Sequence, residues 1–101
     1  MFKGGMAGMM QKAKQMQEDM ESVQKEIKSL TCEGASASGA LKVEMNGNHQ
    51  VTNIFIDETL MSDKDMLEGL IMMAVNDASS KIGEISKEKM KRNASKQRIN
   101  F

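Results

Sequence analysis

The stretch GALKVEMNGNHQVTNIFID, residues 39–57, decides the fold class of this 101-residue chain. Within it Leu41, Val43 and Met45 alternate with polar residues, which is typical of a strand with one buried face. The sequence NGN at residues 46–48 follows, and an Asn-Gly pair tolerates the positive φ angles of a tight hairpin turn. The stretch therefore predicts a β-hairpin in the middle of the chain.

The returning half of this hairpin is less regular. Val51, Ile54 and Ile56 cannot all lie on one face of a strand whose side chains alternate. Two interpretations remain open at this point: a bulge near Thr52 to Asn53, or a strand that is buried on both faces.

A long helix is predicted before the hairpin, from about Met6 to Leu30, because apolar residues recur at alternating spacings of four and three. Such a stripe packs against another helix. The sequence CEGASASGA at 32–40 breaks the period and predicts a linker or an edge strand. The stripe consists of Met9, Ala13, Met16, Met20, Val23, Ile27 and Leu30.

A second long helix is predicted after the hairpin. Ser62 fits an N-cap with Asp65 three residues later, and helical character is expected to reach about Met90. Residues 1–8 are expected to form a flexible arm and residues 92–101 a frayed basic tail. The apolar stripe of this helix is Leu67, Leu70, Ile71, Ala74, Ala78, Ile82 and Ile85.

The predicted fold class is α+β, with a long helix, a small antiparallel sheet of about three strands and a second long helix in a single domain, residues 1–101. A chain of this size has a thin core, and the first helix carries more apolar surface than the sheet and one partner helix can cover. We therefore expect a homodimer, with an interface that includes Met16, Met20, Val23, Ile27 and Leu30.

Composition argues against several classes of protein. The longest apolar run, LIMMAV at 70–75, is far shorter than the roughly 20 residues of a membrane-spanning helix, so we expect a cytoplasmic protein without a membrane partner. The single cysteine, Cys32, and the single histidine, His49, provide no metal cluster, and no convergent set of catalytic groups is visible. We expect no cofactor, no metal and no enzymatic activity, with His49 as an exposed turn residue.

Charge is segregated along this neutral chain. Residues 81–101 contain seven bases and two acids, residues 1–16 contain three bases and no acid, and residues 32–80 contain eight acids and two bases. Cations near a helix C-terminus complement its dipole, which accounts for two or three of the lysines. Six bases between Lys87 and Arg98 exceed that need, so the two ends are expected to contact a polyanion.

Three segments together resemble the YbaB/EbfC family of bacterial nucleoid-associated proteins: KQMQEDMESVQKEI, GALKVEMNGNHQVTNIFID and LMSDKDMLEGLIMMAVNDASSKI. The resemblance covers residues of about 10 to 90. It implies a curved sheet, a homodimer whose long helices project like the arms of tweezers, and DNA binding with little sequence specificity. Glu58 stands where the family usually has proline, and the sequence NASKQRINF replaces a tail rich in proline and glycine.

The chemistry of these residues favours the backbone of duplex DNA as the ligand, because no zinc site, helix-turn-helix signature or set of stacking aromatics is present. Effects on nucleoid organisation and gene expression would follow. An alternative function is an interaction module for DNA repair or replication proteins. For Asn76 and Asp77, a contact that fixes dimer geometry and an ordinary hydrogen bond are both open. The candidate DNA-binding residues are Lys3, Lys12, Lys14, Lys81, Lys87, Lys89, Lys91, Arg92, Lys96 and Arg98.

Overall fold

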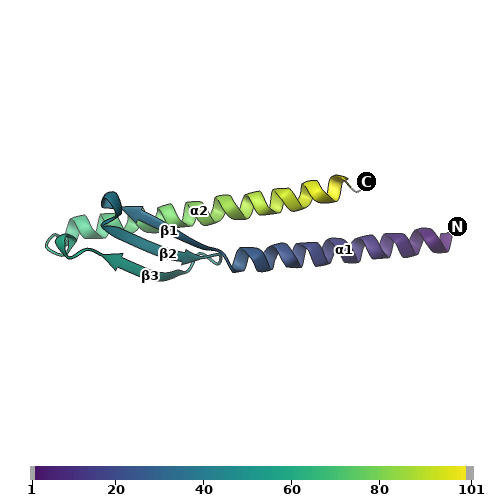
Figure 1. Cartoon of the computed structure of the whole chain (residues 1–101), viewed down its shortest axis with the longest axis horizontal. Coiled ribbons are helices and arrows are strands. Elements are labelled where there is room, and N and C mark those ends of the chain that lie inside the picture. Colours follow the sequence, from purple (N-terminus) through teal and green to yellow (C-terminus); the bar gives the residue numbers. More distant parts are fainter. Residues whose placement is uncertain (1, 100–101) are drawn as a thin grey trace.

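The computed structural model describes the backbone of residues 2–99 and the side chains of residues 7–94. The predicted α+β class and the order of helix, sheet and helix are confirmed. The two helices run antiparallel beyond the sheet, and both chain ends lie at the same end of a molecule that measures 75 × 19 × 16 Å (Figure 1). The elements are α1 (Phe2–Lys28), β1 (Thr31–Ser36), η1 (Ala37–Gly39), β2 (Leu41–Asn46), β3 (Val51–Ile56), η2 (Glu58–Leu60) and α2 (Lys64–Ile99).

The sheet is antiparallel with the strand order β1-β2-β3. Glu44 opposes Asn53 while Met45 opposes Val51, so Thr52 is the extra residue of a bulge. The predicted bulge is therefore confirmed. The alternative of a strand buried on both faces is wrong, because α2 covers β1 and β2 and leaves most of β3 exposed.

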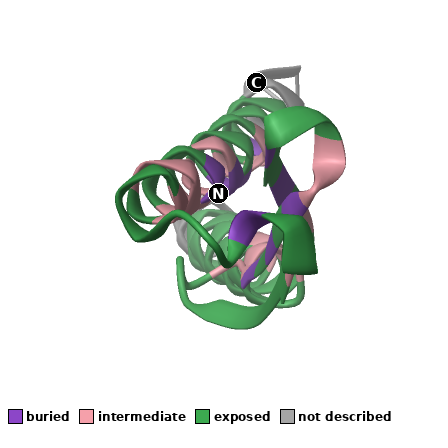
Figure 2. Ribbon diagram, turned by 90° about the vertical axis from the view of Figure 1, so that its left-hand side faces the viewer, coloured by how far each residue is buried: buried purple, intermediate pink, exposed green. Residues whose placement is uncertain are grey.

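The core lies between β2 and α2. The alternating residues Leu41, Val43 and Met45 are buried against the stripe of α2 that includes Ala78 and Ile82. The core residues lie where α2 faces the sheet (Figure 2). Small alanines on this stripe allow the helix to approach the sheet closely. The three-four spacing of apolar residues in the sequence correctly predicts which face of α2 is buried.

The hairpin turn uses its residues differently from the prediction. The positive φ angle, 60°, belongs to His49, whereas Gly47 has none. The turn closes with a hydrogen bond of 3.0 Å from the His49 amide to the Asn46 carbonyl. Glycine is needed at 47 for another reason, because a Cβ atom there would clash with the carbonyl group of Ile27 at the end of α1. The turn and the first helix are therefore in direct contact.

Both helices are longer than predicted. α1 begins at Phe2, which replaces the flexible arm expected over 1–8, and α2 continues to Ile99, which replaces most of the frayed tail expected over 92–101. Residues 1, 100 and 101 lie outside the described part of the chain. The chain has no proline, and residues 84–99 have no glycine and are rich in good helix formers such as Lys, Met, Arg, Gln and Ala, so no local signal ends α2 earlier.

The N-cap of α2 is Asp63 rather than the predicted Ser62. The amide of Met66 donates to Asp63 Oδ1 at 3.1 Å, and the amide of Leu67 donates to the Asp63 carbonyl. Asp63 therefore satisfies the first free amides of the helix and places negative charge at its positive end.

Candidate nucleic-acid interface

The outward face of α2 carries two lysines one helical turn apart. Lys87 and Lys91 stand four residues apart, so they share a face of the helix, and both are exposed. Neither forms an ion pair with any of the side chains described between 7 and 94. Their ammonium groups are therefore available to an anion from solvent.

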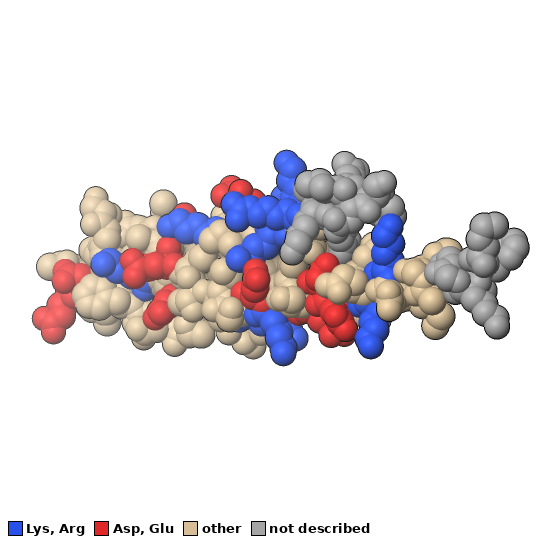
Figure 3. Space-filling model, turned by 45° about the vertical axis from the view of Figure 1, so that its right-hand side comes forward, with Lys and Arg blue, Asp and Glu red and all other residues tan. Residues whose placement is uncertain are grey.

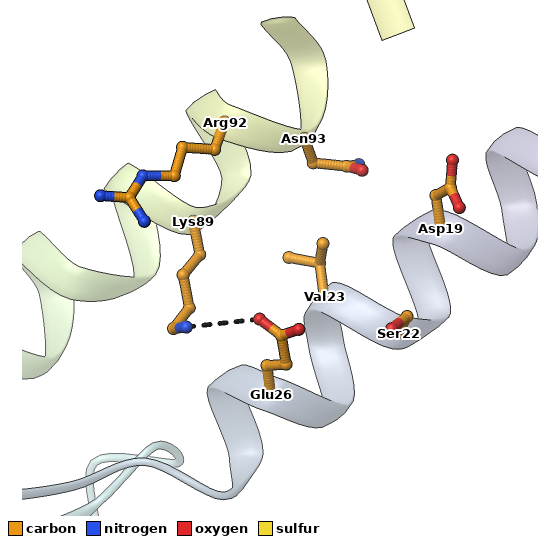
Figure 4. Close-up of a pocket in the computed structure, with 7 residues that line it drawn as sticks. All are labelled: Asp19, Ser22, Val23, Glu26, Lys89, Arg92 and Asn93. Carbon is orange, nitrogen blue, oxygen red and sulfur yellow. Dashed lines mark hydrogen bonds and ion pairs between the residues drawn. The ribbon is translucent and has the colours of Figure 1, made fainter. Parts of the chain in front are cut away.

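Lys89 points in the other direction, toward α1. Its Nζ lies 3.3 Å from Glu26 Oε2, and its side chain is only 30% exposed (Figure 4). Lys89 is therefore not free in solvent, unlike the candidate residues Lys87 and Lys91. The reason is helical spacing, since Ile82, Ile85 and Lys89 continue the stripe that faces the rest of the protein.

Two other candidate cations of α2, Arg92 and Lys81, have acidic partners. Arg92 lies 3.4 Å from Glu88 on the same helix. Lys81 lies 3.1 Å from Asp77 and donates to the Glu33 carbonyl at 2.9 Å, so it fastens α2 to the edge of β1. These side chains are partly neutralised within the chain.

Asp77 also joins α2 to β1. It accepts a hydrogen bond of 3.1 Å from the amide of Ala35 in β1. This amide, and then Lys81, hold the pKa of the Asp77 carboxyl below its ordinary value. Of the two interpretations of Asn76 and Asp77, a structural hydrogen bond is the one seen for Asp77, while Asn76 is exposed.

The candidate residues on α1 do not form one cluster. Lys12 and Lys14 are both exposed and lie two residues apart, which places them on nearly opposite faces of the helix. Lys14 lines a shallow hollow with Gln11, Gln15 and Glu18. The side chains of Lys3, Lys96 and Arg98 lie outside the described residues.

A cleft of about 220 Å³ separates the two helices and has charged walls of both signs. Asn93 on α2 is 7% exposed and points into it, toward α1 (Figure 4). On the face drawn in Figure 3, Lys and Arg side chains are interleaved with Asp and Glu along the molecule. The cleft is therefore less attractive to phosphate than the outward face of α2. Its lining residues are Asp19, Ser22, Val23, Glu26, Lys89, Arg92 and Asn93.

Other kinds of site find little support in the part of the chain that the structure describes. No group of three or more potential metal ligands is present among those residues. None of the helices described there is long and apolar enough to cross a membrane. His49 is exposed, as predicted, with its Nδ1 3.1 Å from Ser79 Oγ.

The predicted dimer residues fall into two groups. Met16 and Met20 remain 41% and 36% exposed on α1. Val23, Ile27 and Leu30 are half-buried within their own chain. Only the first two therefore keep a large apolar surface free.

Known proteins share the sequence pattern and the fold of this chain. The YbaB/EbfC DNA-binding family matches residues 2–97, which is nearly the whole chain. The chain belongs to this family. Its membership supports a nucleoid-associated, DNA-binding role. The fold is similar to the crystal structure of an uncharacterized protein from Helicobacter pylori, with a TM-score of 0.67 and 23% sequence identity over 82% of this chain and 86% of the other.

Sequence reasoning missed two residues of this YbaB/EbfC chain that shape its interface. Glu26 was not among the candidate residues, although it pairs with Lys89, and Asn93 was not considered, although it is buried. A signal for Asn93 was present, because Ile82, Lys89 and Asn93 follow one another at helical spacing. Nothing comparable identified Glu26, since its partner lies 63 residues away.

Proposed function

We propose that this YbaB/EbfC protein binds duplex DNA as a homodimer, mainly through the phosphate backbone and with little sequence specificity, as part of the nucleoid. The observation that supports this best is a pair of exposed lysines on the outward face of α2, Lys87 and Lys91, which have no ion-pair partner among the side chains of residues 7–94. They stand in the basic segment that ends with Lys96 and Arg98.

Backbone binding follows from the chemistry of these side chains. An ammonium group neutralises phosphate and releases counterions, and such contacts carry no base identity. Aromatic side chains for stacking bases are nearly absent, since the chain has three phenylalanines and no tryptophan or tyrosine. Unrelated duplexes are therefore expected to bind alike.

Uncovered apolar side chains support the homodimer. Val51 and Ile54 are 41% and 43% exposed, although they pair with Met45 and Val43 and so lie on the apolar face of the sheet. α2 does not extend over them. Contiguous apolar surface of this kind is typical of a protein interface. Together with Met16 and Met20, these residues form the proposed dimer surface, and a dimer doubles the number of available cations.

Titration of the purified protein against unrelated duplexes at several salt concentrations tests the proposal. If about six phosphates are neutralised by the dimer, the slope of log affinity against log salt is expected to be roughly −5. The double variant Lys87→Glu/Lys91→Glu is expected to lose most of this binding while its helical signal stays unchanged.

The control is Lys42→Glu/Lys64→Glu, which makes the same change in net charge at exposed positions on β2 and at the start of α2. An equal loss in both variants would show that net charge alone matters and would refute the assignment of the site. No retention of the parent protein on DNA at moderate salt would refute DNA binding and favour the alternative, an interaction module for repair or replication proteins.

A further inference from the structure

The ion pair between Glu26 and Lys89 joins the two helices. Its partners come from α1 and α2, 63 residues apart, with the nitrogen and oxygen atoms 3.3 Å apart. The ion pairs described for Lys81 and Arg92 involve carboxylates on α2 itself. Lys89 is therefore the described cation of this segment that is neutralised by the other helix.

We propose that Glu26 is an intramolecular competitor of DNA phosphate for Lys89 and thereby limits the affinity of the protein for DNA. This inference rests on the proposed function, because it adds Lys89 to the cations that contact DNA phosphate. A carboxylate offers Lys89 the same kind of anionic oxygen as a phosphate does. DNA can use Lys89 only when that oxygen is displaced.

The geometry makes such an exchange attainable. The Glu26 side chain is 58% exposed at the cleft, so water and salt screen the pair and the pair is weak. Lys89 has a long apolar stem, which allows its ammonium group to reach toward solvent while the stem stays packed. Asp19 and Glu26 line the same cleft, so the carboxylates of α1 also repel a phosphate that approaches between the helices.

The variant Glu26→Gln removes the charge and keeps the shape of the side chain. It is expected to bind duplex DNA about two- to fivefold more tightly per subunit, which is the range that corresponds to an exposed ion pair. Because Lys89 then becomes available to phosphate, the slope of log affinity against log salt is expected to become steeper by about 0.9 per subunit.

Glu21→Gln is the matched control, because this substitution makes the same change in net charge. Glu21 is exposed on α1 and does not line the cleft. Lys89→Gln, alone and combined with Glu26→Gln, completes a double-mutant cycle. The gain from Glu26→Gln is expected to disappear when Lys89 is absent. Circular dichroism and light scattering of each variant verify that the helices and the oligomeric state are unchanged.

The inference would be overturned by equal affinities of the parent protein and Glu26→Gln, or by an equal gain in Glu21→Gln. A gain that persists without Lys89 would also overturn it. These results differ from a failure of the proposed function, in which the parent protein itself shows no binding to titrate.

Discussion

At the scale of the residue, Gly34 has no room for a side chain. A Cβ atom at this position of β1 would clash with the backbone of α2 at Ala74 and Ala78. Backbone atoms cannot rotate away as a flexible side chain can, so the helix itself would have to move off the sheet. The close approach of α2 to β1 therefore requires glycine at this position, where a hydrogen atom takes the place of a side chain.

Gly34→Ala is expected to lower the free energy of unfolding by about 3 kcal/mol, which is the upper part of the range for overpacked cores. Gly69→Ala is the control, because a Cβ atom there meets nothing within 4 Å inside α2. It is expected to raise the same free energy by about 0.5–1 kcal/mol, since alanine favours helix over glycine. Urea unfolding followed by circular dichroism measures both. A neutral Gly34→Ala would contradict the packing described here.

Asp77 predicts a dependence of stability on pH. Its pKa is lowered in the folded protein by the Ala35 amide and by Lys81. The stabilisation is therefore fully present above the unfolded pKa of about 4 and is lost as pH falls through the folded pKa. Asp77→Asn is expected to be less stable than the parent protein at pH 7, with a smaller difference at pH 3. Urea unfolding at both pH values measures this, and a difference independent of pH would contradict it.

At the scale of the element, α2 and β2 could be predicted from the spacing of their apolar residues, because each buries one face. Leu41, Val43 and Met45 alternate as strand residues do, and the stripe of α2 is visible as far as Ile85. Helix ends were less predictable, since Ser62 and Asp63 are both good caps and only the backbone geometry selects Asp63.

The site was predictable only in part. The basic character of residues 87–92 is visible in the sequence, and helical geometry separates Lys87 and Lys91 from Lys89. The ion pair between Lys89 and Glu26 was not predictable, because it depends on how α1 turns relative to α2. A single sequence contains no local signal for that rotation.

The cap of α2 gives a prediction at this scale. Asp63→Ala removes the hydrogen bond to the Met66 amide and is expected to lower the free energy of unfolding by about 1 kcal/mol. Ser62→Ala is the neighbouring control and is expected to change it by less than about 0.5 kcal/mol, as an exposed residue outside the cap. Denaturant unfolding of the two variants measures the difference. A larger loss of stability in Ser62→Ala than in Asp63→Ala would indicate that Ser62 is the cap.

At the scale of the whole molecule, one narrow layer of core residues holds together a shape 75 Å long. The two helices extend beyond the sheet (Figure 1), and residues 7–18 of α1 are all exposed. Met9 and Met10 on α1 are 73% and 72% exposed. Such a protomer is expected to gain stability from association.

Light scattering at micromolar concentration is expected to give twice the mass of the chain. Ile54→Lys places a charge on the proposed dimer surface at an already exposed position and is expected to give a monomer with its helical signal intact. Lys42→Glu, on the opposite face of the sheet, is the control and is expected to stay dimeric. A monomeric parent protein, or a dimeric Ile54→Lys, would contradict the proposed surface.

The contact of Gly47 with the Ile27 carbonyl has a mechanical consequence. It lies at the base of α1, whose 27 residues reach about 40 Å from that point at 1.5 Å per residue. A lever of this length moves its tip by about 7 Å for a tilt of about 10°, or roughly two base-pair steps of 3.4 Å. A side chain at position 47 that pushed the end of α1 away from the hairpin turn would therefore be expected to shift the far end of the helix by several ångströms.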